Sequence, residues 1–523
     1  MRRARLSGNA APRSDAENAP FVLWYHVFGR GLGAEKDPFE IDSHDTVPLL
    51  FRHVDNRYAI HYARAAENVI HLAVSADGLI HHGGDALRIG YVDLDGAGFA
   101  QYAVRQGAAA VVVSAEGLET ARADIGELPV PFFIAENPRA ELARLAAAFH
   151  GRQPATMVAV TGTNGKTSNV ELCRQLWRMA GHPSASIGTL GVTTADDQVT
   201  TGLTTPDIVT FLSNMAGLER MGISHAAFEA SSHGLAQYRT EGLPVRAAAF
   251  TNFSRDHLDY HGTMEAYFEA KMRLFEEVVE PDGTAVIWMD DVKSEEVLAR
   301  CRARGLATLT VGKAGETLKL VARETTPMGQ KLTVEADGRS HIVNLALIGA
   351  YQAANALTAA GLVIATGGGP GATLASLSRV HPVRGRLERA VLTRAGTPVY
   401  VDYAHTPDAI ESAIEALRPH AKDRLIIVFG AGGDRDVGKR AEMGAAAARL
   451  AEGGTAPVVP GKPDGVEVFT DELEIDGIVV RRDDGVRPAS FDAPPSGDWV
   501  VLVHLVFANG DGDGAYFWHV IVP

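Results

Sequence analysis

The sequence contains only two cysteines, Cys173 and Cys301, among 523 residues. Two thiols cannot build a disulfide framework or a four-cysteine zinc site, and such sparse use is typical of a reducing cytoplasm. No apolar run approaches the roughly 18 residues that a membrane-spanning helix needs. Asp15 and Glu17 precede the first apolar patch, residues 21–25, which is unlike a secretory signal. The sequence therefore predicts a cytoplasmic protein without a membrane anchor.

Positive charge is also scarce in this chain. Lys and Arg number 49 against 64 Asp and Glu, which gives a formal net charge of −15. We therefore expect no nucleic-acid or membrane partner, although this balance still permits a local basic pocket. The composition, 46% hydrophobic and 22% charged, excludes collagen-like, disordered and disulfide-scaffold proteins. The length predicts about three domains, and we expect the chain to act as a monomer.

Between about residues 103 and 419, apolar β-branched runs alternate with helical patterns. The strand-like runs lie at residues 109–113, 157–160, 247–250 and 424–429, and helical patterns lie at residues 139–149 and 169–180. This alternation predicts an α/β fold in which helices cover parallel sheets. Breaks rich in Gly and Pro near residues 129–138 and 367–385 predict three domains, residues 1–135, 136–381 and 382–523.

The strongest local signal is the run of residues 158–168, where a β-branched strand leads into a Gly turn and then a helix. Glycines let backbone N–H groups close on phosphate oxygens, and the helix N-terminus adds its positive end. Lys166 can reach the β- and γ-phosphates, and the Thr167 hydroxyl can bind Mg²⁺. The usual loop has a further Gly where this chain has Val160, and Gly162 supplies an earlier turn at closer spacing. The run predicts nucleotide binding, with an ordinary Gly turn as the alternative.

Acidic and imidazole side chains follow two further strand-like runs. Glu229 ends a short apolar run, at the position where open α/β sheets hold their ligands. Residues 251–261 combine two histidines, two aspartates, an arginine and an asparagine, and His257 is among them. A carboxylate and a neutral imidazole suit a divalent ion that bridges ATP phosphates. The alternative for both segments is a solvated polar loop.

Three later positions carry weaker signals. Lys271 lies in the helical pattern of residues 264–279, which by itself predicts an exposed helix lysine. Asp402 ends a strand-like run that leads into a polar turn. Arg435 follows a second strand-to-Gly turn, from which it can clamp a carboxylate through two hydrogen bonds. The alternative for each is ordinary loop chemistry.

Taken together, these motifs resemble the Mur ligases, and most closely the branch that adds the third amino acid to UDP-N-acetylmuramoyl-L-alanyl-D-glutamate. The likeness covers about residues 95–452 and depends on the segments 161–168, 229–239, 251–261 and 401–408 in this order. It implies an α/β architecture of three domains: a UDP-binding domain, a central P-loop ATPase sheet and a C-terminal Rossmann-like domain that receives the amino acid. Residues 432–440 are more similar to the meso-diaminopimelate-adding branch than to the lysine-adding branch.

The resemblance also implies a reaction. The substrate carboxylate attacks the γ-phosphate of ATP to give an acyl phosphate, and the amine of the incoming amino acid then displaces phosphate to form an amide. Phosphoryl transfer needs mainly positioning and charge neutralisation, which the Gly loop, Lys166 and Mg²⁺ can provide. The implied requirements are ATP as co-substrate, Mg²⁺, and a carbamylated Lys271, whose anionic carbamate helps to hold a second Mg²⁺.

Carried over by position, the resemblance assigns roles to individual residues. Catalytic roles fall to Lys166, Glu229, His257 and Lys271. ATP-binding roles fall to Gly162, Thr163, Asn164, Gly165, Lys166, Thr167, Ser168, Asn355, Arg386 and Asp402. Contacts to the UDP-muramoyl-dipeptide or the added amino acid fall to Thr204, Thr205, Ser231, Gln237, Arg239 and Arg435. Metal-binding roles fall to Thr167, Glu229, His257 and the carbamate on Lys271.

Both ends of the chain depart from the family's pattern. Beyond Glu452 the Asp-Asn-Pro-Arg and Gly-Lys-Gly-His-Glu segments are missing, and residues 74–83 stand where an Asp-Ser-Arg…Pro-Gly pattern is expected. We hypothesise that residues 1–94 and 453–523 are translated out of frame or come from a rearranged gene, which a reading of the coding DNA in all three frames tests.

Two alternatives to the diaminopimelate-adding ligase remain open from the sequence. One is a ligase like folylpolyglutamate synthetase, and the other is an inactive nucleotide-binding member of the family with disrupted ends. The run of residues 231–239, which begins with Ser231 and Ser232, favours the muramoyl substrate over the first alternative.

Overall fold

The computed structural model describes residues 69–74, 87–92, 99–105, 108–200, 203–392, 398–421, 425–428 and 438–451, and four strands at 472–475, 478–482, 500–504 and 518–521. All of these residues belong to one unit, Asp55–Pro523. Arg435 and most of the two atypical ends lie outside the described residues. The role predicted for Arg435 and the frame hypothesis therefore stay predictions. The three domain boundaries also stay predictions.

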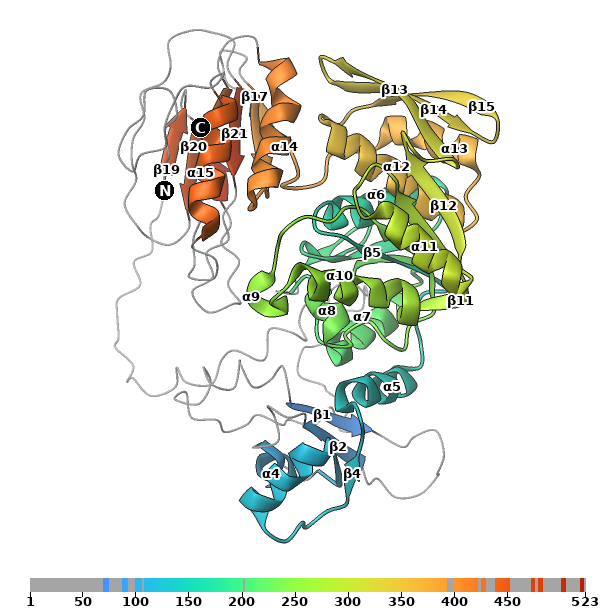
Figure 1. The fold of residues 1–523 in the computed structure, drawn as a ribbon, viewed down its shortest axis with the longest axis vertical. Coiled ribbons are helices and arrows are strands. Elements are labelled where there is room, and N and C mark those ends of the chain that lie inside the picture. The colour runs from blue at the N-terminus through green and yellow to red at the C-terminus, as the bar shows by residue number, and fades with distance from the viewer. Residues whose placement is uncertain are drawn as a thin grey trace, which may run out of the picture. The chain divides into compact units, whose positions relative to one another are not determined.

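The largest sheet has 11 strands in the order β15-β14-β13-β12-β11-β10-β5-β9-β6-β7-β8. Figure 1 labels β5 and the strands from β11 to β15. The strands from β13 to β6 run parallel to their neighbours, whereas β14 and β15 at one edge and β7 and β8 at the other are antiparallel. The strands are β5 Thr156–Thr161, β6 Ser184–Gly188, β7 Gly191–Thr193, β8 Gln198–Val199, β9 His225–Glu229, β10 Val245–Phe250, β11 Val279–Trp288, β12 Ala307–Gly312, β13 Leu318–Thr326, β14 Gly329–Ala336 and β15 Arg339–Leu345.

Strand β5 illustrates why the middle of this sheet is buried on both faces. Because side chains alternate along a strand, Met157 and Ala159 join one hydrophobic core, and Val158 and Val160 join the other. All four are 0% exposed. Such a strand is a continuous apolar run in the sequence, and the predicted α/β fold with helix-covered parallel strands is confirmed.

Helices cover both faces of the sheet. One core receives side chains from α5 Pro138–His150, α7 Ile208–Arg220, α10 Met264–Arg273 and α11 Ser294–Arg304. The other receives them from α6 Lys166–Met179, α12 Ala350–Ala365, α13 Pro370–Ser376 and the 3₁₀ turn Leu377–Arg379. Two short helices, α8 Ser232–Ala236 and α9 Leu258–His261, follow the ends of β9 and β10.

A smaller four-stranded sheet precedes the central one, in the order β1-β2-β3-β4. Its strands are β1 Val69–Val74, β2 Leu87–Val92, β3 Ala110–Val113 and β4 Phe132–Ile134, and its helices are α3 Ala100–Arg105 and α4 Ala115–Ile125. β1 and β2 are antiparallel, and the other pairs are parallel.

The C-terminal part contains a second four-stranded sheet in the order β16-β17-β21-β18. β21 lies between β17 and β18 and runs parallel to both. The strands are β16 Glu388–Leu392, β17 Pro398–Asp402, β18 Leu425–Val428 and β21 Val500–His504, and the accompanying helices are α14 Pro407–Leu417, the 3₁₀ turn Arg418–His420 and α15 Gly438–Ala451. A three-stranded sheet contains β19 Glu472–Ile475, β20 Ile478–Arg482 and β22 Trp518–Ile521.

One predicted helix differs from the structure at its end. The pattern of residues 264–279 predicts one continuous helix, but α10 ends at Arg273 and a π-helical turn, Leu274–Val278, leads directly into β11. The wider turn lets Leu274, Phe275 and Val278 all enter the core before the chain becomes a strand. Hydrophobic spacing alone does not distinguish such a turn from a helix that continues.

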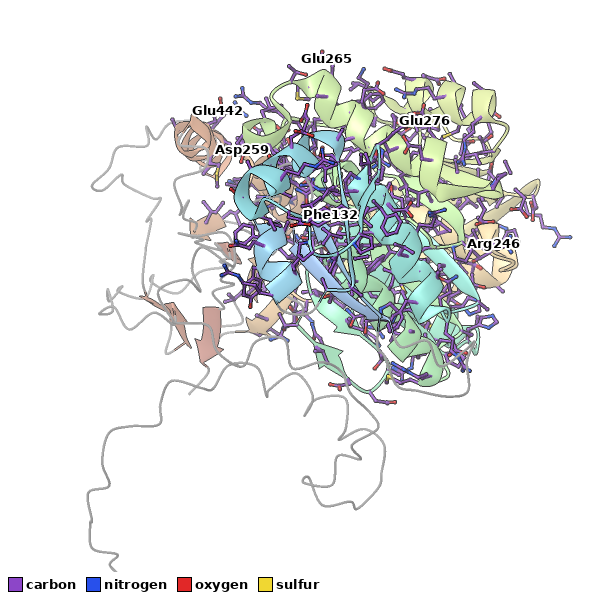
Figure 2. The ribbon with its side chains drawn as sticks, turned by 90° about the horizontal axis from the view of Figure 1, so that it is seen from below. Phe132, Arg246, Asp259, Glu265, Glu276 and Glu442 are labelled. Atoms are coloured by element: carbon purple, nitrogen blue, oxygen red, sulfur yellow. The ribbon has the colours of Figure 1, made fainter. Side chains whose placement is uncertain are left out.

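Many charged side chains lie on the outside of these layers, as Asp259, Glu265 and Glu442 do in Figure 2. The ion pair between Arg246 and Asp282 is also solvated, with side-chain exposures of 49% and 73%. Exposed pairs of this kind contribute little to stability. Within the part of the chain that the structure describes, no helix has the length and apolar character needed to cross a bilayer.

Candidate active site

The phosphate loop predicted from the sequence lies between β5 and α6. β5 ends at Thr161, and α6 begins after Gly165, whose φ of +90° lies in the left-handed region. A Cβ atom on Gly165 would lie 2.3 Å from Asn355 Oδ1, and one on Gly162 would lie 1.9 Å from Thr251 Oγ1. Both positions therefore require glycine, because neighbouring side chains occupy the space that a side chain would need.

The segment after β10 supports this loop. β10 pairs with β5 in parallel, with Phe250 opposite Thr161, so residues 251–252 reach the loop directly. Asn252 Oδ1 accepts from the Asn164 backbone N–H at 2.8 Å, and Thr251 Oγ1 donates to the Asn164 carbonyl oxygen at 2.7 Å. Strand register thus brings the predicted segments 161–168 and 251–261 together.

Two lysines meet behind the loop. Lys166 Nζ donates to the carbonyl oxygens of Gly162 and Thr163 at 2.9 and 2.8 Å, and Lys271 Nζ donates to the same Gly162 oxygen at 2.8 Å. The interpretation of Lys271 as an exposed helix lysine is wrong, because the residue is 0% exposed. Burial lowers the pKa of Lys166, and burial together with the charge of Lys166 lowers the pKa of Lys271 well below its usual value. The structure therefore favours a neutral amine on Lys271.

Tyr267, one turn before Lys271 on α10, completes this cluster. Its hydroxyl lies 3.2 Å from Thr163 Oγ1, and Lys271 Nζ lies 4.3 Å from the centroid of its ring. Burial raises the pKa of Tyr267, so its phenol stays protonated. Helix α10 is thereby attached to the phosphate loop through two side chains.

Glu229 ends β9, and β9 pairs with β5 on the side opposite β10. The side chain is buried, and its Oε1 accepts from the Thr189 backbone N–H at 2.8 Å. Thr189 Oγ1 lies 3.4 Å from Glu229 Oε2 and 3.2 Å from Thr204 Oγ1. A carboxylate has about four lone-pair positions, so oxygen lone pairs remain for a cation. The predicted position of Glu229 at the carboxyl end of a strand is confirmed.

His257 has left-handed backbone conformation, with a φ of +52°. Its Nε2 lies 3.4 Å from Asp256 Oδ2, and Nε2 of His405, from the segment after β17, lies 4.0 Å from the same oxygen. Burial, opposed by the nearby Asp256 carboxylate, lowers the pKa of His257 to about 3. The imidazole is therefore neutral at pH 7 and keeps a nitrogen lone pair for a metal ion.

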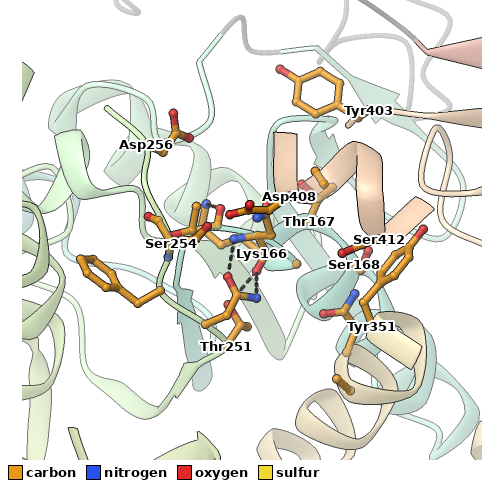
Figure 3. A pocket seen from close by; sticks show the side chains of 18 of the residues that line it. Lys166, Thr167, Ser168, Thr251, Ser254, Asp256, Tyr351, Tyr403, Asp408 and Ser412 are labelled. Carbon is orange, nitrogen blue, oxygen red and sulfur yellow. Dashed lines mark hydrogen bonds between the residues drawn. The ribbon is translucent and has the colours of Figure 1, made fainter. Parts of the chain in front are cut away.

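The side chains of Lys166, Glu229, His257 and Lys271 line one cavity of about 530 Å³, and Figure 3 shows Lys166, Asp256, Tyr351 and Tyr403 around it. The volume is within the usual range for ligand pockets, roughly 300–1,000 Å³. Most of the predicted site residues line this cavity: Thr163, Asn164, Gly165, Lys166, Thr167, Ser168, Thr204, Glu229, Ser231, His257, Lys271, Asn355, Arg386 and Asp402.

The C-terminal part contributes the far wall of the cavity. Arg386 donates to Thr167 Oγ1 at 2.8 Å, and its guanidinium lies 4.3 Å from the centroid of the Tyr403 ring. Asp402 accepts from the backbone N–H groups of Leu387 and Ala404 at 2.7 and 2.8 Å. Burial raises the pKa of Asp402 to about 6, although Arg386 and these hydrogen bonds oppose the shift. The hydrogen bond from Arg386 to Thr167 connects the segment before β16 to the start of α6.

Comparison with known proteins agrees with this arrangement. The Mur ligase middle-domain model matches residues 160–363, and the model of the Mur ligase glutamate ligase domain matches residues 385–502. The UDP-N-acetylmuramoyl-L-alanyl-D-glutamate–2,6-diaminopimelate ligase of Zymomonas mobilis is 55% identical over 359 residues, which are 69% of this chain and 72% of that protein. The chain belongs to the Mur ligase family.

Other relatives of this Mur ligase carry the same name. The ligase of Bradyrhizobium diazoefficiens is 48% identical over 365 residues, which are 69% of this chain and 73% of that protein. A solved structure of a ligase with this name has a TM-score of 0.58 at 26% identity and covers 79% of this chain and 85% of its own. The resemblance inferred from the motifs is confirmed, and the C-terminal family model extends beyond Glu452 to residue 502.

The residues predicted to contact the UDP-muramoyl-dipeptide in this Mur ligase are not all equally accessible. Thr204 and Ser231 line the cavity. The hydroxyl of Thr205, which is 2% exposed, donates to the Glu229 carbonyl oxygen at 2.8 Å. Arg239 is also buried and donates to the Thr205 carbonyl oxygen at 3.1 Å, and Gln237 donates to Tyr260 Oη at 3.0 Å. Thr205 thus contributes to the shape of the segment after β9.

Sequence reasoning did not single out Thr189 or Tyr267. Thr189 lies 40 residues before Glu229 in the sequence, and Tyr267 lies 104 residues after Thr163. Neither residue belongs to a recognisable local sequence pattern. Each acts through a contact that forms only when distant segments come together in the folded sheet. In this Mur ligase they hold the predicted carboxylate and the predicted loop in place.

Proposed function

We propose that this Mur ligase is an ATP-dependent ligase that joins meso-diaminopimelate to UDP-N-acetylmuramoyl-L-alanyl-D-glutamate, a step of peptidoglycan synthesis. The observation that carries the proposal is the single cavity lined by the phosphate loop, Glu229, His257 and buried Lys271. The names of the 55% and 48% identical relatives support the muramoyl substrate and diaminopimelate over the folylpolyglutamate alternative.

ATP is the nucleotide that this cavity suits best. The backbone after β5 and the N-terminus of α6 supply N–H groups for phosphate oxygens, and Lys166 supplies a cation. Asn355 on α12 also lines the cavity and accepts from Asn169 Nδ2 at 3.1 Å, which fixes its side-chain amide beside Gly165. Arg386 and Asp402 line the cavity from the C-terminal part. We assign the base and ribose to Asn355, Arg386 and Asp402, and the triphosphate to the backbone of the loop.

Mg²⁺ fits the donors that the cavity offers. A buried carboxylate on Glu229, the Thr167 hydroxyl and the neutral imidazole of His257 line the same space. Among the described residues, no group of three or more His, Cys, Asp and Glu side chains is arranged to hold a metal ion. This agrees with Mg²⁺ chemistry, since Mg²⁺ is usually bound by one or two protein oxygens together with phosphates and water. When bound, Mg²⁺ would neutralise charge on the triphosphate.

Lys271 is suited to carry a carbamate. The neutral amine nitrogen forms a bond to the carbon of CO₂ and loses one proton, which leaves an anionic carbamate. The environment of Lys271 supports the neutral amine, because the side chain is fully buried beside the charge of Lys166. A carbamate at this position would place an anion next to the cation of Lys166.

The proposed reaction has two steps. A carboxylate oxygen of the muramoyl-dipeptide attacks the γ-phosphorus of ATP, and ADP leaves with the electrons of the broken P–O bond. The amine of diaminopimelate then attacks the acyl carbon, phosphate leaves, and the amine loses a proton. This chain contributes positioning and charge. Lys166 supplies a cation at the phosphate loop, and Glu229, His257 and Lys271 lie around the transferred group. Arg435 is our candidate for binding the carboxylate of the added amino acid.

Phosphate release from ATP tests this function. We expect release only when UDP-N-acetylmuramoyl-L-alanyl-D-glutamate and an amino acid are both present, with meso-diaminopimelate accepted in preference to lysine in parallel assays. Release with a folate substrate would favour the folylpolyglutamate alternative. ATP binding without turnover on any substrate would instead mark the chain as an inactive nucleotide-binding member of the family.

A further inference from the structure

The segment of residues 235–241, which we call the acceptor segment, begins in the last turn of α8 and runs toward β10. It carries Gln237 and Arg239, two of the residues that the family resemblance assigns to the UDP-muramoyl-dipeptide. Between them, Tyr238 has a φ of +58°, a left-handed conformation that few residues other than glycine adopt. A conformation of this kind persists only where the surrounding structure holds it in place.

Arg273, the last residue of α10, makes contacts along the whole acceptor segment. Its guanidinium donates to the Leu235 carbonyl oxygen, lies 3.9 Å from the centroid of the Tyr238 ring, and donates to Glu241 Oε1 at 2.7 Å. The side chain is only 15% exposed. A single planar cation thus contacts the beginning, the middle and the end of the segment, and it lies against the residue with the strained backbone.

The charge of Arg273 is already balanced within the protein. Glu241 accepts from it at 2.7 Å, and Glu277 Oε2 accepts from it at 2.6 Å. Two carboxylates therefore face one guanidinium, and Arg273 does not line the cavity that holds the phosphate loop. We conclude that Arg273 acts through the acceptor segment and does not bind a substrate anion itself.

The same helix also holds the phosphate loop. Lys271, two residues before Arg273, donates to the Gly162 carbonyl oxygen at 2.8 Å. Helical positions two apart point roughly 200° away from each other, because each residue turns the helix by about 100°. One face of α10 thus meets the loop predicted to bind ATP, and the opposite face meets the segment predicted to bind the carboxylate substrate.

We propose that Arg273 is a positioning residue that keeps the acceptor segment in the conformation required to bind the UDP-muramoyl-dipeptide. This role rests on the proposed function of the site. Without the guanidinium, Tyr238 loses its stacking partner and the Leu235 carbonyl and Glu241 lose their donor. The segment then leaves its strained conformation, while the phosphate loop stays anchored through Lys271 and Tyr267.

The test is a comparison of kinetic constants for Arg273→Met and the wild-type protein. We expect KM for UDP-N-acetylmuramoyl-L-alanyl-D-glutamate to rise about tenfold or more, while KM for ATP changes by less than about twofold. Arg273→Lys should fall between the two proteins, because lysine keeps the charge but lacks the planar fork. Glu241→Gln weakens one contact of Arg273 and preserves side-chain volume. It should raise KM for UDP-N-acetylmuramoyl-L-alanyl-D-glutamate by about threefold, and it replaces Arg273→Met as the test if that variant does not fold.

Arg300→Met provides a matched control. Arg300 of α11 also bonds two carboxylates, Glu269 at 2.7 and 2.8 Å and Glu276 at 2.7 Å, and it also lies against an aromatic ring of α10, that of Phe268, at 5.9 Å. It contacts α10 away from the acceptor segment. We expect Arg300→Met to lower the melting temperature without changing KM for either substrate.

The outcomes separate the two proposals. If the wild-type protein releases phosphate but Arg273→Met and Glu241→Gln have unchanged KM for the muramoyl substrate, the positioning role is refuted and the proposed function is not. The same conclusion follows if KM for ATP rises as much as KM for the muramoyl substrate. If the wild-type protein releases no phosphate with the muramoyl substrate, the proposed function is refuted, and the positioning role is refuted with it.

Discussion

Lys166 and Lys271 donate hydrogen bonds to one acceptor, the Gly162 carbonyl oxygen, at 2.9 and 2.8 Å. Two ammonium groups this close repel each other strongly in a buried environment. Both lysines have lowered pKa values, and Lys271 has the larger reduction, with burial as the main cause and the charge of Lys166 as the second. The pair therefore favours one cation, on Lys166, and one neutral amine, on Lys271. A neutral lysine amine is the form that reacts with CO₂.

The first prediction concerns the carbamate. Lys271→Ala should lower kcat by about 100-fold or more, because a charged group that positions the transferred phosphate is lost. The variant leaves a space behind Gly162 that a small carboxylate can enter, so acetate or formate should restore part of the activity. The measurement is phosphate release as a function of added carboxylate.

Lys166→Ala is the control for this rescue. It should also abolish turnover, because the cation at the phosphate loop is lost, but a carboxylate should not restore it. Near-normal activity of Lys271→Ala without any added carboxylate would remove the carbamate from the mechanism.

The second prediction is that Lys271 lowers the stability of the ligand-free protein. Since its pKa is lower in the folded state, the unfolded chain binds a proton that the folded chain does not, and the free energy of unfolding increases with pH up to the ordinary lysine pKa. Lys271→Met removes this cost, and Lys166 still donates to Gly162. The melting temperature in CO₂-free buffer should rise by about 2–4 °C, the shift produced by roughly 1 kcal/mol. The gain should be largest at pH 6 and should shrink toward pH 10; a gain that grows with pH would contradict the lowered pKa.

The sequence predicted the parts of the site that local pattern determines. A β-branched strand, a Gly turn and a helix start follow one another at residues 158–168, so β5, the loop and α6 could all be inferred. Glu229 could be assigned to the end of a strand for the same reason. These features depend on neighbours in the sequence, whose preferences agree with the final fold.

The environment of Lys271 could not be predicted in this way. Its helical pattern is compatible with exposure, and its burial arises only because the start of the loop after β5 meets α10 across 109 residues of sequence. The π-helical turn after Arg273 was missed because its apolar spacing also fits a helix. Both errors concern contacts between distant segments, which periodicity does not encode.

The third prediction concerns acid stability away from the cavity. His225 begins β9 and is half-buried, with its ring stacked on His182 at 4.2 Å and packed against Trp177 at 5.1 Å. Burial and then the neighbouring His182 lower its pKa to about 4. The unfolded chain takes up a proton below pH 6.5, whereas the folded chain does not, so stability falls as pH decreases from 6.5 toward 4.

His225→Phe keeps a ring in this position and removes the titrating group. Its melting temperature should fall less than that of the wild type between pH 7 and pH 5, by the equivalent of about 1 kcal/mol, because solvent around a half-buried ring screens the full effect. Calorimetry at both pH values measures the difference. Parallel pH profiles for the two proteins would show that His225 does not contribute.

The last prediction concerns the space beside the proposed metal site. Gly188 ends β6, and a Cβ atom there would lie 2.0 Å from Glu229 Oε1 and 2.6 Å from its Cδ and Cγ atoms. Glu229 is buried and fixed by the Thr189 N–H, so the carboxylate must move to accommodate a methyl group. Gly188→Ala should therefore lower kcat about tenfold or more and raise the Mg²⁺ concentration needed for half-maximal activity. Gly369→Ala is the control, since a Cβ there has no atom within 4 Å. We expect it to keep wild-type kinetics, and normal Mg²⁺ dependence in Gly188→Ala would mean that Glu229 is not a metal ligand.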